Sequence, residues 1–484
     1  MALTCRAFFG PAMDILWSEI PNLVPLIKCM PPDLWQVSGT WYWGDSRPED
    51  TILSLRRALL VTDWERFSIY APRVRSFGFT DQLHYNICIA DQAVCAEAFR
   101  DISLCKPTEQ LLPNLRHLGW SDKDQLLAPY VHLFLGPKLH SLNLDLHDED
   151  HTKVSSMLSY ASFKCPYLTH VELAYKLDKS NDVQDISKFI TGLAHLVKLD
   201  IKIPSLSAES IIHLSNLDCL EALLMRVPNL GDADLHAAKH FHPAHDSSVG
   251  FPSLQHLNIV TTRLSSILSV CRLMRSTPAK SISFSFETAT NDEVRSLIKI
   301  LHDQCSHSLL ETLCVRQKNP SSSTPIAPGI SIVPLFAFRN LQSLYVQSIS
   351  LALNDALVRD LAVSWPELVC LDIAADLNAA AHATLLTLAS LQILAGHCPR
   401  LVQVQLHVDS RVLPDPLDGF VGEKVAILEL RSSPISDADD VAGFLMEVFP
   451  NLYSIHASDP LAAVGGLPNR WQRVNDILAN RFTN

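Results

Sequence analysis

The sequence predicts an α/β solenoid, in which short parallel strands alternate with helices along a curved sheet. Three observations lead to this prediction. An apolar pattern recurs through most of the chain, prolines precede many of its copies, and helix-like spacing fills the intervals between copies. The 484 residues are too many for one ordinary globular core, and 48% of them are hydrophobic, enough to bury a long one.

The recurring pattern is one apolar residue, two variable residues, a second apolar residue, one variable residue and a third apolar residue. A single short strand cannot bury its inward side chains, whereas stacked repeats bury them in one continuous core. From Leu115 onward the copies lie 24 to 34 residues apart, near the period of leucine-rich repeats. We therefore predict leucine-rich repeats over residues 71–457, forming a horseshoe with a parallel concave sheet. The copies begin at Val74, Leu115, Leu139, Leu168, Leu196, Leu220, Leu254, Ala279, Leu310, Leu341, Leu368, Leu401, Val425 and Leu452.

Prolines mark the entry to many of these strands. Proline ends the preceding helix and sets up the turn into the strand. Such prolines are Pro113, Pro137, Pro166, Pro252, Pro366, Pro399 and Pro450.

The intervals between strands are predicted to be helical. Val294, Leu297, Ile298 and Leu301 follow the spacing of one helix face. Further helices are predicted over residues 379–395 and 437–448. The alternative fold, a doubly wound α/β sheet, needs fewer strands and usually a glycine-rich phosphate turn, which this sequence lacks.

The composition argues against several classes of function. The formal net charge is −12 and no Lys/Arg run is longer than Arg56-Arg57, so a nucleic-acid interface is not expected. No run of about 18 uninterrupted apolar residues predicts a membrane span. The 12 cysteines are scattered without a CxxC pair, which indicates reduced thiols in a cytoplasmic or nuclear protein.

One histidine cluster, made of His236, His240, His242 and His245, raises the alternative of a metal enzyme or hydrolase. Its first two members are one helical turn apart, a spacing that suits zinc. An HExxH motif and a nearby cysteine pair are both missing, so a variable surface loop is the favoured interpretation. Because no other catalytic motif is present, we expect a protein that is not an enzyme and needs no metal or cofactor.

The variable positions inside each strand are predicted to point to the concave face. An extended sheet of this kind can bind a protein or peptide over many repeats. For any single position the alternative is a solvated residue of the kind every solenoid has. The predicted partner-binding residues are His117, Asn143, Asp145, His170, Glu172, Lys198, Asp200, Lys202, Arg226, His256, Asn258, Tyr345, Asp372, Gln403 and Gln405, with Ser283 and Glu429 in the same ladder.

The N-terminal residues carry a family resemblance. The run Leu3-Thr4-Cys5-Arg6-Ala7-Phe8-Phe9, followed by Leu16-Trp17, resembles the C-terminal half of an F-box. In that family a Cys-Arg/Lys-x-aromatic helix precedes a helix with Leu-Trp. Four later segments resemble fungal F-box/leucine-rich-repeat proteins in the expected order: Asp33-Leu34-Trp35, Asp63-Trp64-Glu65-Arg66-Phe67, Tyr70-Ala71-Pro72-Arg73-Val74-Arg75-Ser76-Phe77 and Arg470-Trp471-Gln472-Arg473-Val474-Asn475.

The resemblance implies a substrate-recognition subunit of an SCF-type ubiquitin ligase. Its implied partners are a Skp-type adaptor with its cullin complex and a protein target, whose lysine the repeats would present while catalysis stays in the partners. The expected organisation is a partial F-box-like helical segment over residues 1–36, a linker and helical cap over 37–70, the repeats, and a C-terminal cap over 458–484. The implied adaptor-binding residues are Leu3, Cys5, Phe8, Phe9, Pro11, Leu16 and Trp17.

Two alternatives accompany this interpretation. The usual F-box opens with a Leu-Pro-x-Glu-type helix, and this sequence begins after it, so a box truncated at its N-terminal half is expected. The apolar N-terminal residues are alternatively a cap that seals the first repeat. The protein is then a leucine-rich-repeat interaction scaffold without ubiquitin-ligase association.

Overall fold

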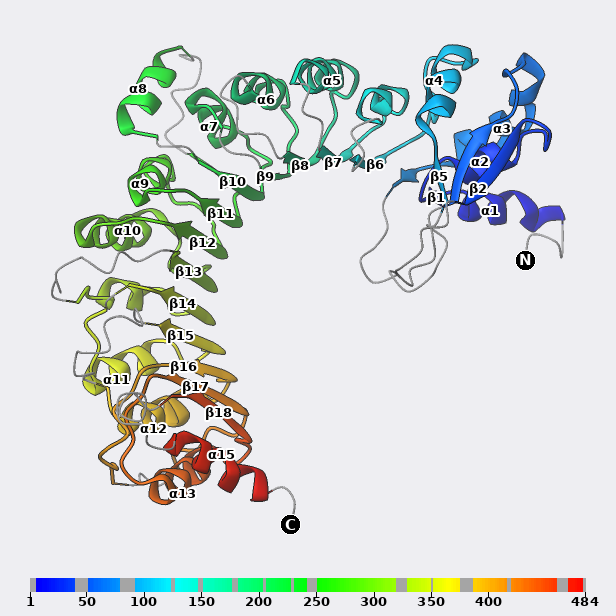
Figure 1. Ribbon diagram of the computed structural model, residues 1–484. Coiled ribbons are helices and arrows are strands. Elements are labelled where there is room, and N and C mark those ends of the chain that lie inside the picture. The colour runs from blue at the N-terminus through cyan, green and yellow to red at the C-terminus, as the bar shows by residue number, and fades with distance from the viewer. Residues whose placement is uncertain are drawn as a thin grey trace. The chain divides into compact units, whose positions relative to one another are not determined.

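The computed structural model is an α/β solenoid of the leucine-rich-repeat type, as the sequence predicts (Figure 1). Two compact units divide the chain: unit 1 is Met1–Leu220 and unit 2 is Glu221–Asn484. In each unit parallel strands follow one another in chain order, and helices lie along one side of them (Figure 1). The structure describes residues 6–39, 51–78, 92–122, 127–146, 151–175, 182–202, 206–227, 230–241, 250–318, 329–349, 351–374, 386–415, 419–458 and 469–481.

Unit 1 contains the first strands of the solenoid and a separate group of N-terminal elements. Its solenoid strands are β1 (Glu19–Ile20), β4 (Ser76–Phe77), β6 (His117–Asp122), β7 (Ser141–Leu146), β8 (His170–Tyr175) and β9 (Lys198–Lys202). The helices that follow these strands are α4 (Ala96–Cys105), η4 (Ala128–Leu133), α5 (His151–Lys164), α6 (Asp182–Thr191) and α7 (Ala208–Ser215). The N-terminal helices are α1 (Arg6–Leu16), α2 (Val24–Lys28), η1 (Val61–Asp63), α3 (Trp64–Tyr70) and η2 (Ala71–Arg73).

Unit 2 continues the alternation of strand and helix. Its strands are β10 (Ala222–Arg226), β11 (His256–Val260), β12 (Ser281–Phe286), β13 (Thr312–Gln317), β14 (Ser343–Gln347), β15 (Cys370–Ala374), β16 (Gln403–Gln405), β17 (Ile427–Arg431) and β18 (Ser454–Ala457). Its helices are α8 (Asp232–Phe241), α9 (Leu264–Cys271), α10 (Asn291–Gln304), η5 (Val333–Ala337), α11 (Asp355–Ser364), α12 (Leu388–His397), α13 (Ala438–Val448) and α15 (Arg470–Arg481).

The predicted strand positions are confirmed, because each of the fourteen copies of the pattern contains one strand, β4 or one of β6 to β18. Their apolar side chains form the core: in the copy that contains β7, Leu139, Leu142 and Leu144 are all buried. Burying one such side chain stabilises the fold by roughly 1.5–3 kcal/mol. The repeated burial therefore fixes which face of each strand turns inward.

Two parts of the sheet structure were not predicted. The two-residue strand β1 pairs with β4, with Glu19 beside Ser76, so the solenoid begins before its first recognisable repeat. A second sheet joins β2 (Trp35–Gly39), β3 (Thr51–Leu55) and β5 (Gln92–Val94), with β2 antiparallel and β5 parallel to β3. Neither carries the repeat pattern, which explains why the sequence did not indicate them.

The two helices predicted by residue range have different outcomes. The helix expected over residues 437–448 is α13, and Asp437 caps it by accepting hydrogen bonds from the amides of Asp439 and Asp440. The start expected at residue 379 is wrong, because Thr387 has an extended backbone and caps α12, which begins at Leu388. Residues 379–385 lie outside the described residues.

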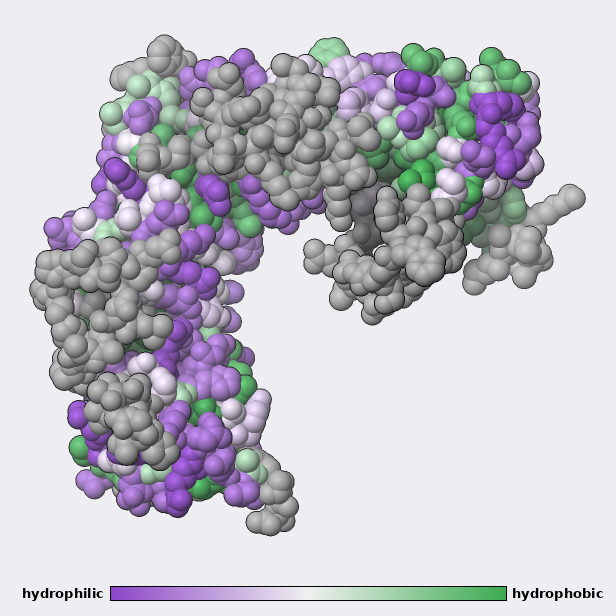
Figure 2. Space-filling view, viewed as in Figure 1, coloured by the Kyte–Doolittle hydropathy of each residue, from purple (hydrophilic) through white to green (hydrophobic). Residues whose placement is uncertain are grey.

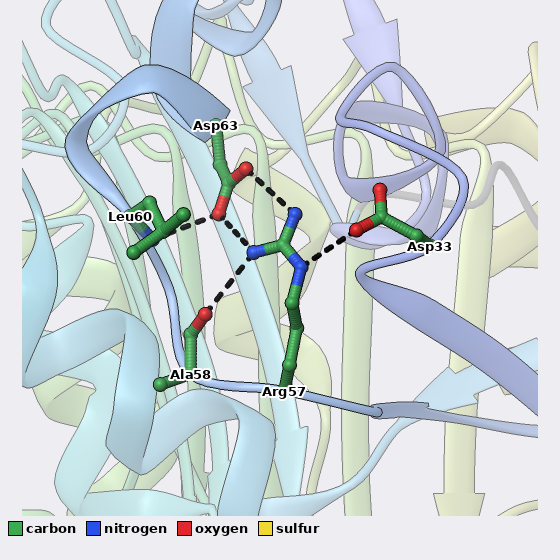
Figure 3. Close-up of polar contacts among 5 residues, drawn as sticks. All are labelled: Asp33, Arg57, Ala58, Leu60 and Asp63. Atoms are coloured by element: carbon green, nitrogen blue, oxygen red, sulfur yellow. Dashed lines mark hydrogen bonds and ion pairs between the residues drawn. The ribbon is translucent and has the colours of Figure 1, made fainter.

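An ion-pair cluster connects the N-terminal elements of unit 1. Figure 3 shows Arg57 between two carboxylates: its guanidinium donates to Asp63 at 2.7 and 2.9 Å and to Asp33 at 2.8 Å. Asp63 also accepts from the backbone amide of Leu60 at 2.8 Å. Because α3 begins directly after Asp63, the cluster fixes the start of that helix.

The last strand of unit 2 is covered by α15. Trp471 is fully buried, and its indole N–H donates to the carbonyl of Ser433 at 2.8 Å. The amide of Asn475 accepts from the N–H of Ile455 at 2.7 Å and donates to its carbonyl at 2.8 Å. Asn475 thus satisfies backbone groups that an uncovered edge strand would leave without partners.

Two further findings concern the chemistry of the described ranges. The cysteines found there are free thiols. No helix in this part of the chain is both long enough and apolar enough to cross a bilayer.

Candidate functional site

The first candidate surface is the outer face of α1. Phe8, Phe9, Ile15 and Leu16 are exposed, with exposed fractions of 59%, 48%, 76% and 66%. Figure 2 shows hydrophobic residues at the surface over the N-terminal elements of unit 1. A cluster of exposed aromatic and aliphatic side chains on one short helix is the type of surface that protein partners cover.

The opposite face of α1 packs against the rest of unit 1. Met13 is buried, and Trp17, just after the helix, stacks on Tyr70 of α3 with ring centroids 4.6 Å apart. Arg73 donates to the carbonyl of Gly10 at 3.3 Å and forms an ion pair with Asp14. The helix is therefore fixed in place with its apolar face outward.

The implied adaptor-binding residues have different positions. Phe8, Phe9, Pro11 and Leu16 are exposed on α1, whereas Trp17 is half-buried in the stack with Tyr70. A pocket of about 460 Å³ lies beside them, lined by Asp14, Ile69, Pro72, Arg73 and Arg75. Leu3 and Cys5 lie outside the described residues.

The second candidate surface is the face of the sheet that carries the variable positions. In unit 1 the strand register places its predicted residues in three rows across the strands. The first row contains His117, His170 and Lys198; the second contains Asn143, Glu172 and Asp200; the third contains Asp145 and Lys202.

Charged groups of the second and third rows in unit 1 bind one another. Lys202 donates to Glu172 at 2.6 Å and lies 3.7 Å from Asp200, while Asn143 donates to Glu172 at 3.0 Å. The hydrogen bond to Glu172 raises the pKa of Lys202, and burial raises the pKa of Asp200. This part of the surface is a connected polar network.

The predicted residues of unit 2 also form rows. The first row contains His256 and Gln403, the second contains Asn258, Ser283, Tyr345, Asp372, Gln405 and Glu429, and the third contains Arg226. Figure 2 shows mainly hydrophilic residues on the strand side of this unit. The side-chain hydroxyl of Tyr345 bonds the Cys370 thiol, and this bond together with burial raises the pKa of Tyr345 to about 12.

Two of these unit 2 residues are buried within the row. Asp372 is 4% exposed and Gln405 3% exposed. Gln347 donates to Asp372 at 2.6 Å, and the Gln405 amide, turned with its nitrogen toward the carboxylates, donates to Asp372 at 3.3 Å and Glu429 at 2.8 Å. Burial raises the pKa of Asp372. Asp372 and Gln405 therefore orient the neighbouring side chains and expose little polar surface to a partner.

The structure adds residues that the sequence reasoning missed. Arg316 and Gln347 occupy the third row of unit 2, in register with Arg226, and Arg431 bonds the oxygen of Gln405. The repeat pattern could have indicated Arg316, because it stands one residue after the last apolar position of its copy, as Arg226 does.

The side chains of the histidine cluster lie outside the described part of the structure. His236 and His240 belong to α8, but their side chains are not among those described, and His242 and His245 lie outside the described residues. Elsewhere in the described ranges, His, Cys, Asp and Glu side chains do not gather in a group of three or more that could hold a metal ion.

Comparison with known proteins adds little to these surfaces. No protein-family model matches the chain, and no curated protein matches it. A solved structure similar to it is the crystal structure of the Rad7 and Elc1 complex in yeast. The identity is 15%, the match covers 76% of this chain and 74% of that chain, and the TM-score is 0.36. At this TM-score the likeness carries no argument about function, which therefore depends on the surfaces themselves.

Proposed function

We propose that this protein is a non-catalytic substrate receptor of an SCF-type ubiquitin ligase. In this function α1 binds a Skp-type adaptor and the sheet surface of the solenoid binds the target protein. The observation that carries the proposal is the apolar outer face of α1, formed by Phe8, Phe9, Ile15 and Leu16. The resemblance of this segment to part of an F-box supplies the identity of the partner.

The energetics of α1 favour a partner over exposure to water. Covering aromatic and aliphatic side chains on binding is favourable, by roughly 25 cal/mol per Å² of apolar area removed from water. The stack of Trp17 on Tyr70 and the contacts of Arg73 fix the helix before any partner arrives. A surface that is already ordered loses little conformational entropy when it binds.

The sheet surface supports the second half of the proposal. Its rows combine polar networks, such as Lys202 with Glu172, with exposed groups such as Arg226 and His256. Networks that order these side chains in the free protein lower the cost of binding a target. Catalysis would then lie in the partners, which the solenoid brings together with the target.

The experiment is capture of a purified Skp-type adaptor by the purified full chain. We expect the wild type to capture the adaptor and the double variant Phe8→Asp/Leu16→Asp to lose capture. Phe163→Asp is the matched control, because Phe163 is equally apolar and 77% exposed, but lies on α5. Capture should survive that change.

Two outcomes would contradict the proposal. A wild-type chain that does not bind the adaptor would remove the ligase association and leave the alternative function, an interaction scaffold. Equal loss of capture in the Phe163→Asp control would show that any exposed apolar group on a helix contributes, so that α1 has no special role.

A further inference from the structure

The turns that lead into the strands of unit 1 have an unusual composition. Three positions of each copy lie next to its first apolar residue: the residue before it and the two residues after it. Across the five turns before β4, β6, β7, β8 and β9, none of these positions holds Asp or Glu. The whole chain, by contrast, has 51 Asp and Glu against 39 Lys and Arg. The cationic residues and histidines at these positions are Arg73, Arg75, Arg116, His117, Lys138, His140, His170, His195 and Lys198.

We call the exposed members of this set the basic edge. They are Arg116, His117, Lys138, His140, His170, His195 and Lys198.

Main-chain hydrogen bonds place the residues of the basic edge side by side. The amide of Arg116 donates to the carbonyl of Arg75 at 2.8 Å, and that of His140 to Arg116 at 2.9 Å. The amide of His170 donates to the carbonyl of His140, and that of Lys198 to the carbonyl of Thr169, both at 3.0 Å. Neighbouring strands in such a ladder lie about 4.8 Å apart, and Figure 1 shows β6 to β9 next to one another.

The pKa of His117 reflects the closeness of its neighbours in the basic edge. Burial lowers the pKa of His117, and the charges of His140, His170 and Arg116 lower it further, against an opposing effect of Glu19. These side chains come from three different repeats, so their mutual influence reflects the stacking of the solenoid.

Asp14, Glu172 and Asp200 are engaged by cations outside the basic edge, whereas Glu19 of β1 lies in the same row as His117 and raises its pKa. Asp14 pairs with Arg73, while Glu172 and Asp200 contact Lys202. Within the described part of unit 1, Arg116, Lys138 and Lys198 form no salt bridge. The charges of Arg116, Lys138 and Lys198 therefore remain open to solvent.

The same repeat positions in unit 2 provide an internal comparison. There Glu311 and Glu367 stand among Lys280, Arg400 and Lys424, and Arg400 pairs with Glu367. The turns of unit 2 are thus of mixed charge. Cationic character is a property of unit 1 and not of the repeat itself.

We propose that the basic edge is the docking surface for an extended, carboxylate-rich segment of a partner protein. Charge complementarity selects an acidic segment and speeds its encounter with the surface. Exposed Tyr167, which stacks on His195 with ring centroids 6.0 Å apart, adds an aromatic contact beside the charges. A nucleic acid fits less well, because three of the seven exposed groups are Lys or Arg, whereas nucleic-acid surfaces typically make about 6–10 phosphate contacts.

This inference deepens the proposed function and rests on it, because it names the chemistry of the target that the solenoid binds. Its test is nevertheless separate, since it needs no adaptor. If peptide binding fails while adaptor capture by α1 succeeds, only the inference is lost.

The experiment measures binding of a fluorescent oligoglutamate peptide to the full chain by anisotropy. We expect Arg116→Glu/Lys198→Glu to weaken binding by about tenfold or more, a loss of about 1.4 kcal/mol or more of binding free energy, because the variant reverses the charge complementarity. Lys280→Glu/Lys424→Glu, with the same change of charge at the equivalent turns of unit 2, should leave binding within about twofold. Added salt should weaken wild-type binding.

A second variant and a competitor complete the test. Arg116→Gln/Lys198→Gln removes the charge without reversing it and should give an intermediate loss, and unfolding midpoints establish that each variant is folded. Absence of wild-type binding, or equal loss in the unit 2 control, would overturn the proposal. Tighter binding of single-stranded oligothymidylate than of the peptide would also overturn it, in favour of a nucleic-acid surface.

Discussion

The guanidinium of Arg57 donates two hydrogen bonds, of 2.7 and 2.9 Å, to the carboxylate of Asp63, whose side chain is only 2% exposed (Figure 3). Asp63 stands at the start of α3, and Tyr70 at the end of that helix supports Trp17 behind α1. The ion pair therefore holds the start of α3, the helix that supports α1 and its candidate adaptor surface.

We expect Asp63→Asn to lower the free energy of unfolding at neutral pH by on the order of 1–3 kcal/mol. The hydrogen bonds from Arg57 hold the pKa of Asp63 below its ordinary value of 3.8. A lowered pKa means that the stabilisation is present above the unfolded pKa and is lost as pH falls through the folded one. Urea unfolding should thus show a gap between wild type and variant that is constant near neutrality and closes in acid. A gap that persists at the lowest pH would assign the effect to packing instead.

Asp372 should show the opposite pH dependence. Burial raises its pKa above 3.8, so the folded state favours the neutral carboxyl and the stability contribution is lost as pH rises through the folded pKa. Asp372→Asn, which is neutral at every pH, should therefore equal the wild type in acid and gain stability relative to it as pH rises. Its amide can still accept the hydrogen bond from Gln347. Urea midpoints across pH measure the difference, and a variant less stable than wild type at neutral pH would contradict it.

Removal of Trp471 should destabilise the end of unit 2. Its ring is fully buried and its N–H bonds Ser433, so Trp471→Ala leaves a cavity and a carbonyl without its donor. We expect a loss of about 3–5 kcal/mol, seen as a lower thermal or urea midpoint. Gln472→Ala, at the next and exposed position, is the control. Similar midpoints for the two variants would show that α15 contributes little to the fold.

Two glycines should respond oppositely to alanine. A Cβ at Gly78 would lie 1.9 Å from the carbonyl oxygen of Gly119, and Gly78 has a φ of +74°. Gly78→Ala should cost at least about 1–3 kcal/mol of unfolding free energy. Gly443, inside α13, has open space around it, and Gly443→Ala should stabilise by roughly 0.5–1 kcal/mol. Equal shifts in the unfolding midpoint for both variants would contradict this assignment.

The sequence predicted the solenoid strands well and the burial of the candidate surface residues only in part. Positions such as Leu142 and Leu371 identify their strands because each repeat needs the same inward aliphatic residues. The pattern also located the surface row that contains Asp372, but not its burial. That burial depends on Gln347 and Gln405, which belong to neighbouring repeats.

The sequence by itself determined the repeat, because inward burial imposes a local pattern on every copy. Tertiary structure alone decided two other features. Strand β1, with Glu19 beside Ser76, is too short to carry a pattern and exists through pairing with β4. The basic edge joins Arg116, His140 and Lys198, which are far apart in sequence and form no basic run. They become neighbours because parallel register stacks one position of each repeat on the same position of the next.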